Sequence, residues 1–339
     1  MVLFKFGNFD WACRDVPSLP ICNLFFRQLF VHPKGLEAPA AELLGLPTDA
    51  AAIQSTLKTL GVGVRPSCYI PRMHAVGGQA GSVGNVANIA VCGLSVIVGI
   101  ALCLAAGKRT AAVARKEMQV FLLMFCLVQG AQLADTGALL KVGSTALTWI
   151  SGVHLGLLVG LFWVLAWLAF LSLQIVEDGT LLSIIPMLIG TVVLSVGSAY
   201  IALDTGFTVT NFFRSDPPQD LHSIWLFVLT IIWPAVAAGF YFLVQFGVVV
   251  RVLKEKKPLF LFTIAAGAFI LSQGAYFALS HKICTGTKAK VDGSFVASFL
   301  ELVAVVFIFA GWKSITEDSW EVGLQAACVV RQMRIKSGS

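Results

Sequence analysis

Charged side chains are scarce in this sequence. Lys, Arg, Asp and Glu make up only 12% of the 339 residues, against roughly 25% in a typical soluble domain. The stretch 148–174 contains none of the four. This stretch is longer than the roughly 20 apolar residues with which a helix crosses the hydrocarbon core of a bilayer. The scarcity of charge therefore argues against an ordinary soluble domain and indicates a membrane protein.

The motifs of common enzyme classes are also missing. The sequence lacks the His-Glu-x-x-His zinc pair, the Gly-x-x-x-x-Gly-Lys-Ser/Thr phosphate loop and the Gly-x-Gly-x-x-Gly dinucleotide fingerprint. Ser151 and His154 share one predicted helix, without the nucleophile elbow of a hydrolase. We therefore predict no enzymatic activity, no cofactor and no metal site. The formal charge of +6 comes without any nucleic-acid-binding motif, so no nucleic-acid partner is expected.

Long apolar runs dominate what is present. They predict an all-α integral membrane protein with a bundle of seven transmembrane helices, because a helix satisfies its backbone hydrogen bonds within the segment. The predicted helices cover 82–106, 118–140, 149–174, 181–203, 223–250, 259–280 and 293–312. They divide the chain into an N-terminal region over 1–81, the bundle over 82–312 and a tail over 313–339. Within the N-terminal region, 48–60 is predicted to form a short helix with Thr48 as its cap.

The distribution of Lys and Arg predicts the orientation. The first and fifth connections and the tail carry most of these residues, and the more basic side of a membrane protein faces the cytosol. The N-terminus is therefore predicted in the lumen and the C-terminus in the cytosol. The basic residues on the predicted cytosolic side are Lys108, Arg109, Arg115, Lys116, Arg251, Lys254, Lys256, Lys257, Lys313, Arg331, Arg334 and Lys336.

Four cysteines fall on the predicted lumenal, oxidising side: Cys13, Cys22, Cys68 and Cys284. Four cysteines permit three pairings. We favour a short clip between Cys13 and Cys22 and a long-range bond between Cys68 and Cys284, with free thiols as the alternative. The remaining four cysteines have other predicted roles. Cys92, Cys103 and Cys126 lie within spans and are predicted to be packing residues, and Cys328 in the tail is a candidate palmitoylation site.

Ionisable and amide side chains inside the predicted spans are costly in a bilayer and are default candidates for function. The topology places a group of them at similar depth near the lumenal ends of four helices. This predicted polar layer contains Gln132, Asp135, His154, Gln273 and Glu301. Three interpretations stay open: a network that fixes helix order, a docking site for a partner helix, and a path for protons or ions. A seven-helix receptor or a transporter using this layer is the alternative function, since span number alone does not discriminate.

Several short motifs carry a family resemblance. They occur in order along nearly the whole chain: FGNFDWACRD at 6–15, LPIC at 19–22, RPSCYIPR at 65–72, ARKE at 114–117, QIVEDGTLLS at 174–183, SHKIC at 280–284, VDG at 291–293 and WKSITED at 312–318. With these motifs the chain resembles the fungal chitin synthase export chaperone family. The resemblance implies a multi-span protein of the endoplasmic reticulum membrane, surrounded by membrane lipid, that helps chitin synthase fold and leave this compartment for cell-wall synthesis.

The resemblance also suggests where partners bind. Mixed-charge edges on the predicted cytosolic side are candidates for contact with chitin synthase or with vesicle coat components. The alternative is that these charges only flank the spans and hold the topology. The residues concerned are Arg115, Lys116, Glu117, Glu177, Asp178, Glu317 and Asp318.

Overall fold

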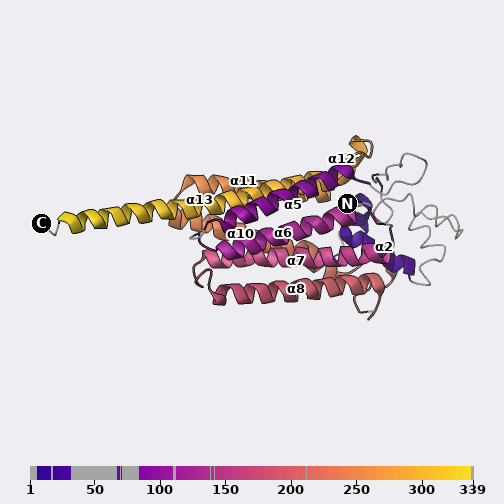
Figure 1. Cartoon of the computed structure of the whole chain (residues 1–339). Coiled ribbons are helices and arrows are strands. Elements are labelled where there is room, and N and C mark those ends of the chain that lie inside the picture. The colour runs from indigo at the N-terminus through magenta and orange to yellow at the C-terminus, as the bar shows by residue number, and fades with distance from the viewer. Residues whose placement is uncertain are drawn as a thin grey trace.

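A computed structural model describes residues 6–16, 18–31, 67–68, 70, 84–109, 112–137, 139–140, 142–210 and 212–336 of the chain. Helices account for nearly all regular structure in this part of the chain (Figure 1). Seven of the described helical segments are long and apolar enough to cross a membrane. This confirms the predicted all-α fold class and the predicted number of spans. The predicted helix over 48–60 lies outside the described residues.

The spans overlap the predicted segments, with shifted ends. They are formed by α5 (Val86–Gly107), α6 (Arg115–Thr136), α7 (Thr145–Ser172), α8 (Leu181–Phe207), α9 (Ile224–Phe227) continued by η2 (Val228–Ile232), α10 (Trp233–Val248) and η3 (Val249–Leu253), α11 (Lys256–Gln273) continued by η4 (Gly274–Ala278), and α13 (Gly293–Lys336). Short connecting helices are η1 (Pro218–Asp220) and α12 (Ser280–Gly286).

The helix α7, which contains no Lys, Arg, Asp or Glu, is the centre of the bundle. It packs against α6, α8 and α10, and α13 closes the other side by packing against α5 and α11. Of the seven spans, α7 buries the largest share of its apolar stretch, 61%. An all-round apolar surface therefore serves contacts on several sides of this helix rather than exposure to lipid alone.

Small residues allow α7 and α8 to pack very closely. A Cβ atom added at Gly156 would collide with the backbone carbonyl of Ser195, and one added at Gly160 would collide with the Ser195 hydroxyl. Helices in membranes associate through close van der Waals packing, which small residues at the interface permit. The close approach of Gly156 to Ser195 therefore helps to explain why α7 pairs with α8.

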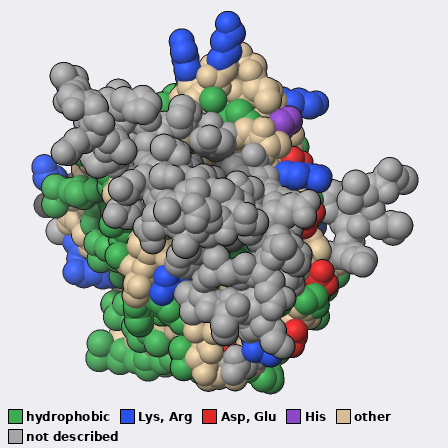
Figure 2. Space-filling model, turned by 90° about the vertical axis from the view of Figure 1, so that its right-hand side faces the viewer, with side chains coloured by type: hydrophobic (Ala, Val, Ile, Leu, Met, Phe, Trp, Pro, Cys, Tyr) green, Lys and Arg blue, Asp and Glu red, His purple; other side chains and the backbone are tan. Residues whose placement is uncertain are grey.

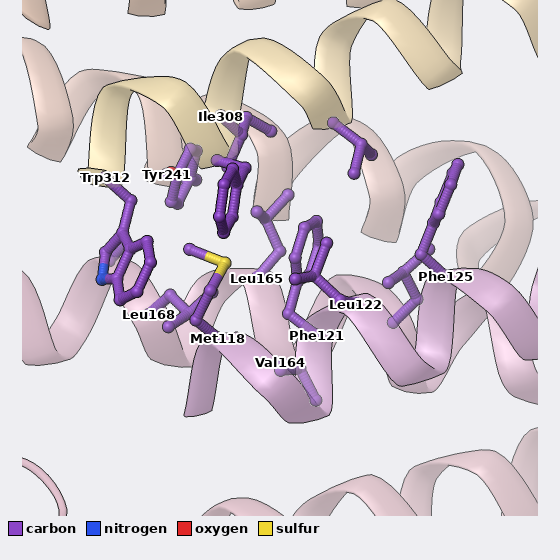
Figure 3. Packing of buried hydrophobic residues seen from close by; sticks show 14 of the residues in the cluster. Met118, Phe121, Leu122, Phe125, Val164, Leu165, Leu168, Tyr241, Ile308 and Trp312 are labelled. Atoms are coloured by element: carbon purple, nitrogen blue, oxygen red, sulfur yellow. The ribbon is translucent and has the colours of Figure 1, made fainter. Parts of the chain in front are cut away.

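Large side chains fill the space among α6, α7, α10 and α13. Figure 3 shows Phe121 and Phe125 of α6, Leu165 of α7 and Ile308 of α13 converging on one apolar layer. Tyr241 of α10 lies in the same cluster and is almost completely buried. Dispersion contacts among such closely packed side chains hold the helices together, because lipid tails are as apolar as the core.

The fifth span is irregular next to a proline. Its π-helical turn, η2, directly precedes α10, in which Pro234 is the second residue. Proline lacks the backbone N–H and its ring collides with the carbonyl one turn earlier, so the chain widens locally instead of continuing as a regular α-helix. This distortion lies beside the cavity described below.

Two features were not predicted from the sequence. The N-terminal region forms α1 (Asp10–Asp15) and α2 (Pro20–Val31), and α2 packs into the bundle against α7 and α8. The predicted last span ends at 312, whereas α13 continues as one helix to Lys336 and projects away from the bundle (Figure 1). In Figure 1 the N-terminus and the C-terminus lie at opposite ends of the molecule.

Candidate functional site

The residues of the predicted polar layer lie on α6, α7, α11 and α13. Asp135 of α6 and His154 of α7 form its most buried pair, with 2.7 Å between Asp135 Oδ2 and His154 Nδ1. Asp135 is completely buried and His154 is 4% exposed. An ionisable side chain at this depth is tolerated when it faces a partner within the bundle, and this pair satisfies that condition.

A second set of bonds joins α5, α6 and α13. The Gln132 amide donates to the Ser298 hydroxyl at 2.8 Å, and this hydroxyl donates to Asn88 Oδ1 at 3.1 Å. Asn88 in turn donates to the Thr136 hydroxyl at 2.7 Å. Asn88 and Ser298 were not predicted from the sequence, because a single neutral polar residue in an apolar run does not stand out. Their side chains link three spans.

Gln129 and Glu301 complete the layer. The Gln129 amide nitrogen donates to Glu301 Oε2 at 3.3 Å, which joins α6 to α13. The Gln129 carbonyl oxygen is buried and has no hydrogen-bond partner among the described residues. Gln273, also predicted for the layer, donates to its neighbour Ser272 at 3.1 Å and does not join the bonds between helices.

A cavity of about 140 Å³ lies beside the layer. Four of the five predicted residues line it, namely Gln132, His154, Gln273 and Glu301, while Asp135 lies behind His154. The rest of its wall is mostly apolar and includes Phe121, Phe125, Leu165 and Ile308 of Figure 3. The cavity therefore joins a polar end to an apolar body, the general form of a ligand-binding pocket.

The N-terminal region is fastened to one end of the bundle. Disulfides join Cys13 to Cys22 and Cys68 to Cys284, the pairing favoured from the sequence. The first bond ties α1 to α2, and the second ties the region to α12. Figure 2 looks onto this end, where Lys and Arg side chains lie around the rim and hydrophobic side chains cover part of the flank.

Buried hydrogen bonds reinforce this attachment. Asn23 of α2 donates to the Ser151 hydroxyl of α7 at 3.0 Å, and Gln28 donates to the Ser215 carbonyl at 2.8 Å. The Ser18 hydroxyl donates to the buried carboxylate of Asp292, just before α13. The segment 18–31 thus packs directly on the bundle.

The opposite end contains the charged motifs predicted for partner contacts. Glu117 of α6 is completely buried, and its carboxylate accepts bonds from the Gly179 N–H at 3.1 Å and from the Ser183 hydroxyl. Asp178 accepts a bond from the Ala114 N–H at 2.7 Å. Glu117 therefore clasps the α7–α8 connection and is not available as a surface contact, which corrects its expected role.

The other predicted contact residues differ in exposure. Lys116 and Glu177 are exposed, and Arg115 is half-buried with a 3.4 Å bond from its guanidinium to the Gly107 carbonyl. Glu317 and Asp318 lie on α13, and their own side chains are outside the described part of the structure.

Among the described residues, no cluster of three or more His, Cys, Asp or Glu side chains has the arrangement of a metal site.

Comparison with known proteins shows similarity along nearly the whole chain. The family model described as chitin synthase export chaperone matches residues 5–326. A chitin synthase export chaperone of Cryptococcus neoformans is 24% identical, over 94% of this chain and 76% of that protein. Proteins of the same name from Yarrowia lipolytica and Kluyveromyces lactis are 26% and 24% identical, covering 93% and 94% of this chain and 86% and 94% of their own lengths. No solved structure matches the chain significantly.

Proposed function

Because this chain belongs to the chitin synthase export chaperone family, we propose that it assists the folding of chitin synthase and its exit from the endoplasmic reticulum. It does so as a multi-pass membrane protein and without catalysis, since the family is one of chaperones. The single observation that carries the proposal is the family match over residues 5–326, which includes the N-terminal region and all seven spans.

The bundle has physical properties suited to this task. A multi-span client exposes helix faces and polar groups before its own helices have packed, and such groups are unfavourable in lipid. This chain offers an apolar outer surface, with exposed side chains such as Ile97 and Leu104 on α5 and Val192 and Val196 on α8. It also offers a mostly apolar cavity with a polar end between the spans. Together they can shelter an incompletely packed client.

The proposed orientation places the N-terminal region in the lumen and the C-terminal end of α13 in the cytosol. Two observations support it. Disulfides form and persist in oxidising compartments such as the lumen. Both disulfides lie at the end of the bundle that carries the N-terminal region, one within this region and one between it and α12. The connections at the opposite end are richer in Lys and Arg, as cytosolic loops are.

The cytosolic edge is the proposed contact for chitin synthase or for vesicle coat components. Lys116 and Glu177 are exposed at this edge, and Asp178 and Arg115 are partly exposed beside them. Glu117 is omitted from the proposal because it is buried. Side chains of opposite charge at one edge suit a polar partner, for which electrostatic complementarity provides specificity.

The location of a fluorescently tagged chitin synthase in cells lacking this protein tests the proposal. We expect the synthase to be retained in the endoplasmic reticulum and cell-wall chitin to fall, with both restored by re-expression of the full chain. An unrelated multi-span cargo serves as a control and is expected to reach the cell surface in both strains. Normal arrival of the synthase in the deletion strain contradicts the proposal.

A further inference from the structure

The cavity beside the polar layer lies where two consecutive helices separate. α10 packs mainly on α7, whereas α11 packs mainly on α13, and the two touch each other only over a short stretch. Both line the cavity, α10 with Pro234, Ala238 and Phe242 and α11 with Phe269 and Gln273. We refer to this cavity, with its flanking α10 and α11, as the α10–α11 cleft.

The inner wall of the cleft is rich in hydrogen-bond acceptors. Gln129 is only 1% exposed, and its carbonyl oxygen has no partner among the described residues. Its amide nitrogen already donates to Glu301, which also lines the cleft. No Lys or Arg is among the described residues that line the cavity. The Gln129 carbonyl oxygen and the Glu301 carboxylate therefore face the cavity without such a cation, and a cation satisfies both a carboxylate and an amide oxygen.

The depth of these acceptors favours a side chain over a lipid head group. Gln129 lies about two turns before the end of α6 at Thr136, and Glu301 about two turns after the start of α13 at Gly293. At 1.5 Å per residue, both lie roughly 10–12 Å inside the helix ends. Lipid head groups stay at the interface, whereas a transmembrane helix can carry a polar side chain at any depth.

The size of the cavity also favours a protein side chain as its occupant. A volume of about 140 Å³ is close to that of an engineered cavity, about 150 Å³, that holds one benzene molecule. This space suits the stem and head of one long side chain, and it is too small for the ring system of a sterol. The absence of Lys and Arg from its described lining also disfavours a phosphate-bearing lipid.

The outer side of the cleft allows a helix to come close. A Cβ atom added at Gly239 of α10, next to the cavity-lining Ala238, meets no atom within 4 Å, and the same holds for Gly274, which follows Gln273. Small residues on a lipid-exposed surface let two helix backbones approach each other. A partner helix can therefore pack closely against α10 and α11, the two helices that flank the cavity.

We propose that the α10–α11 cleft receives a Lys or Arg side chain from a transmembrane helix of the client. The cation meets the Glu301 carboxylate and the free carbonyl oxygen of Gln129, and the apolar walls cover its aliphatic stem. An intramembrane cation is among the most costly groups for an unassembled helix, so the cleft shelters it until the client has packed. This inference rests on the proposed function, which supplies the membrane-embedded client.

The test uses the purified full-length chain in lipid nanodiscs and synthetic transmembrane peptides of Leu and Ala. One peptide carries a single central Lys, a second carries norleucine at that position and a third carries Glu. We expect the Lys peptide to bind about tenfold or more tightly than the norleucine peptide, because a hydrogen bond to a charged group is stronger than a neutral contact. The Glu peptide is expected not to exceed the norleucine peptide.

Glu301→Gln is the matched variant, since it keeps the shape of the side chain and a hydrogen-bonding oxygen toward Gln129. We expect it to remove most of the preference for the Lys peptide over the norleucine peptide. Equal binding of the Lys and norleucine peptides to the unaltered chain overturns the proposal without reference to any variant. An undiminished Lys preference in Glu301→Gln also overturns it.

Two further outcomes separate the alternatives. Glu301-dependent binding of a single-chain alkylamine, without binding of the Lys peptide, overturns the proposal in favour of a lipid site. If chitin synthase leaves the endoplasmic reticulum without this chain, the proposed function itself fails, whatever the peptides do. If export needs the chain while Glu301→Gln retains full Lys-peptide preference, only the inference about the cleft fails.

Discussion

Pairs of polar side chains inside the spans connect the helices at defined points. Asp135 and His154 join α6 to α7, and Gln129 and Glu301 join α6 to α13. A single interhelical hydrogen bond in a membrane protein contributes only about 0.6 kcal/mol on average. Removal of one partner matters more, because the other is left buried without a partner.

Replacement of Asp135 by Ala is expected to destabilise the protein by about 1–3 kcal/mol, because the buried His154 ring then loses its partner. The thermal unfolding midpoint of the purified protein in detergent measures the effect. Leu127→Ala is the control on the same helix, since Leu127 is 46% exposed on the outer surface and is expected to change the midpoint little. Equal midpoints for Asp135→Ala and the unaltered chain would show that the pair contributes nothing.

Two glutamates near the same end of the bundle are predicted to behave differently. Glu117→Ala removes the acceptor for the Gly179 N–H and the Ser183 hydroxyl, so the α7–α8 connection is expected to loosen. Limited proteolysis is expected to cut this connection faster in Glu117→Ala. Glu177→Ala changes an exposed side chain and is expected to leave the cleavage rate unchanged. Similar cleavage rates for the two variants would show that the Glu117 hydrogen bonds do not hold the α7–α8 connection in place.

The polar residues show what sequence can reveal about single positions. Asp135, His154 and Glu301 could be predicted as one layer, because an ionisable residue within an apolar run is conspicuous. Asn88 and Ser298 could not, since neutral polar residues are common in helices and only their neighbours reveal a network. The burial of Glu117 was also unpredictable, because a charge at the end of an apolar run usually points to water.

Close contact between helices depends on the smallest residues. Gly156→Leu places a side chain where the Ser195 carbonyl of α8 now lies, and it is expected to destabilise the protein by about 1–3 kcal/mol through overpacking. Gly197→Leu is the matched control, because a Cβ atom there meets nothing within 4 Å. Thermal unfolding compares the two. A larger loss of stability in Gly197→Leu contradicts the assigned α7–α8 interface.

The spans could be predicted from the sequence because each apolar run is long enough to cross a bilayer on its own. Helix ends shifted by several residues, since capping and local bonds rather than hydropathy determine them. The helix α2 was missed because its segment is short and contains Asn23, Arg27 and Gln28, which find partners only in the folded bundle. The cavity follows from the separate packing of α10 and α11, which no local pattern reveals.

The disulfide between Cys68 and Cys284 links positions 216 residues apart, so it constrains the molecule as a whole. Its removal is expected to cost about 2–4 kcal/mol, because a closed loop restricts the unfolded chain. Cys68→Ser, Cys284→Ser and the double variant are expected to show the same loss in thermal unfolding, since all three lack one bond. A double variant clearly less stable than either single variant contradicts this pairing.

The molecule as a whole combines a helical bundle, an N-terminal region joined to it by a disulfide and a cleft between two of its spans. Under the proposed function, a protein of this design is expected to bind its client transiently rather than to change it chemically. We therefore expect direct contact with newly made chitin synthase and release of that client once it has packed.

Pulse–chase co-purification tests this requirement most directly. Newly labelled chitin synthase is expected to co-purify with the full-length chain early in the chase and to dissociate as it leaves the endoplasmic reticulum. An unrelated multi-span protein of the same membrane provides the background level. Synthase recovery that never exceeds this background, although export still depends on the chain, would contradict the account.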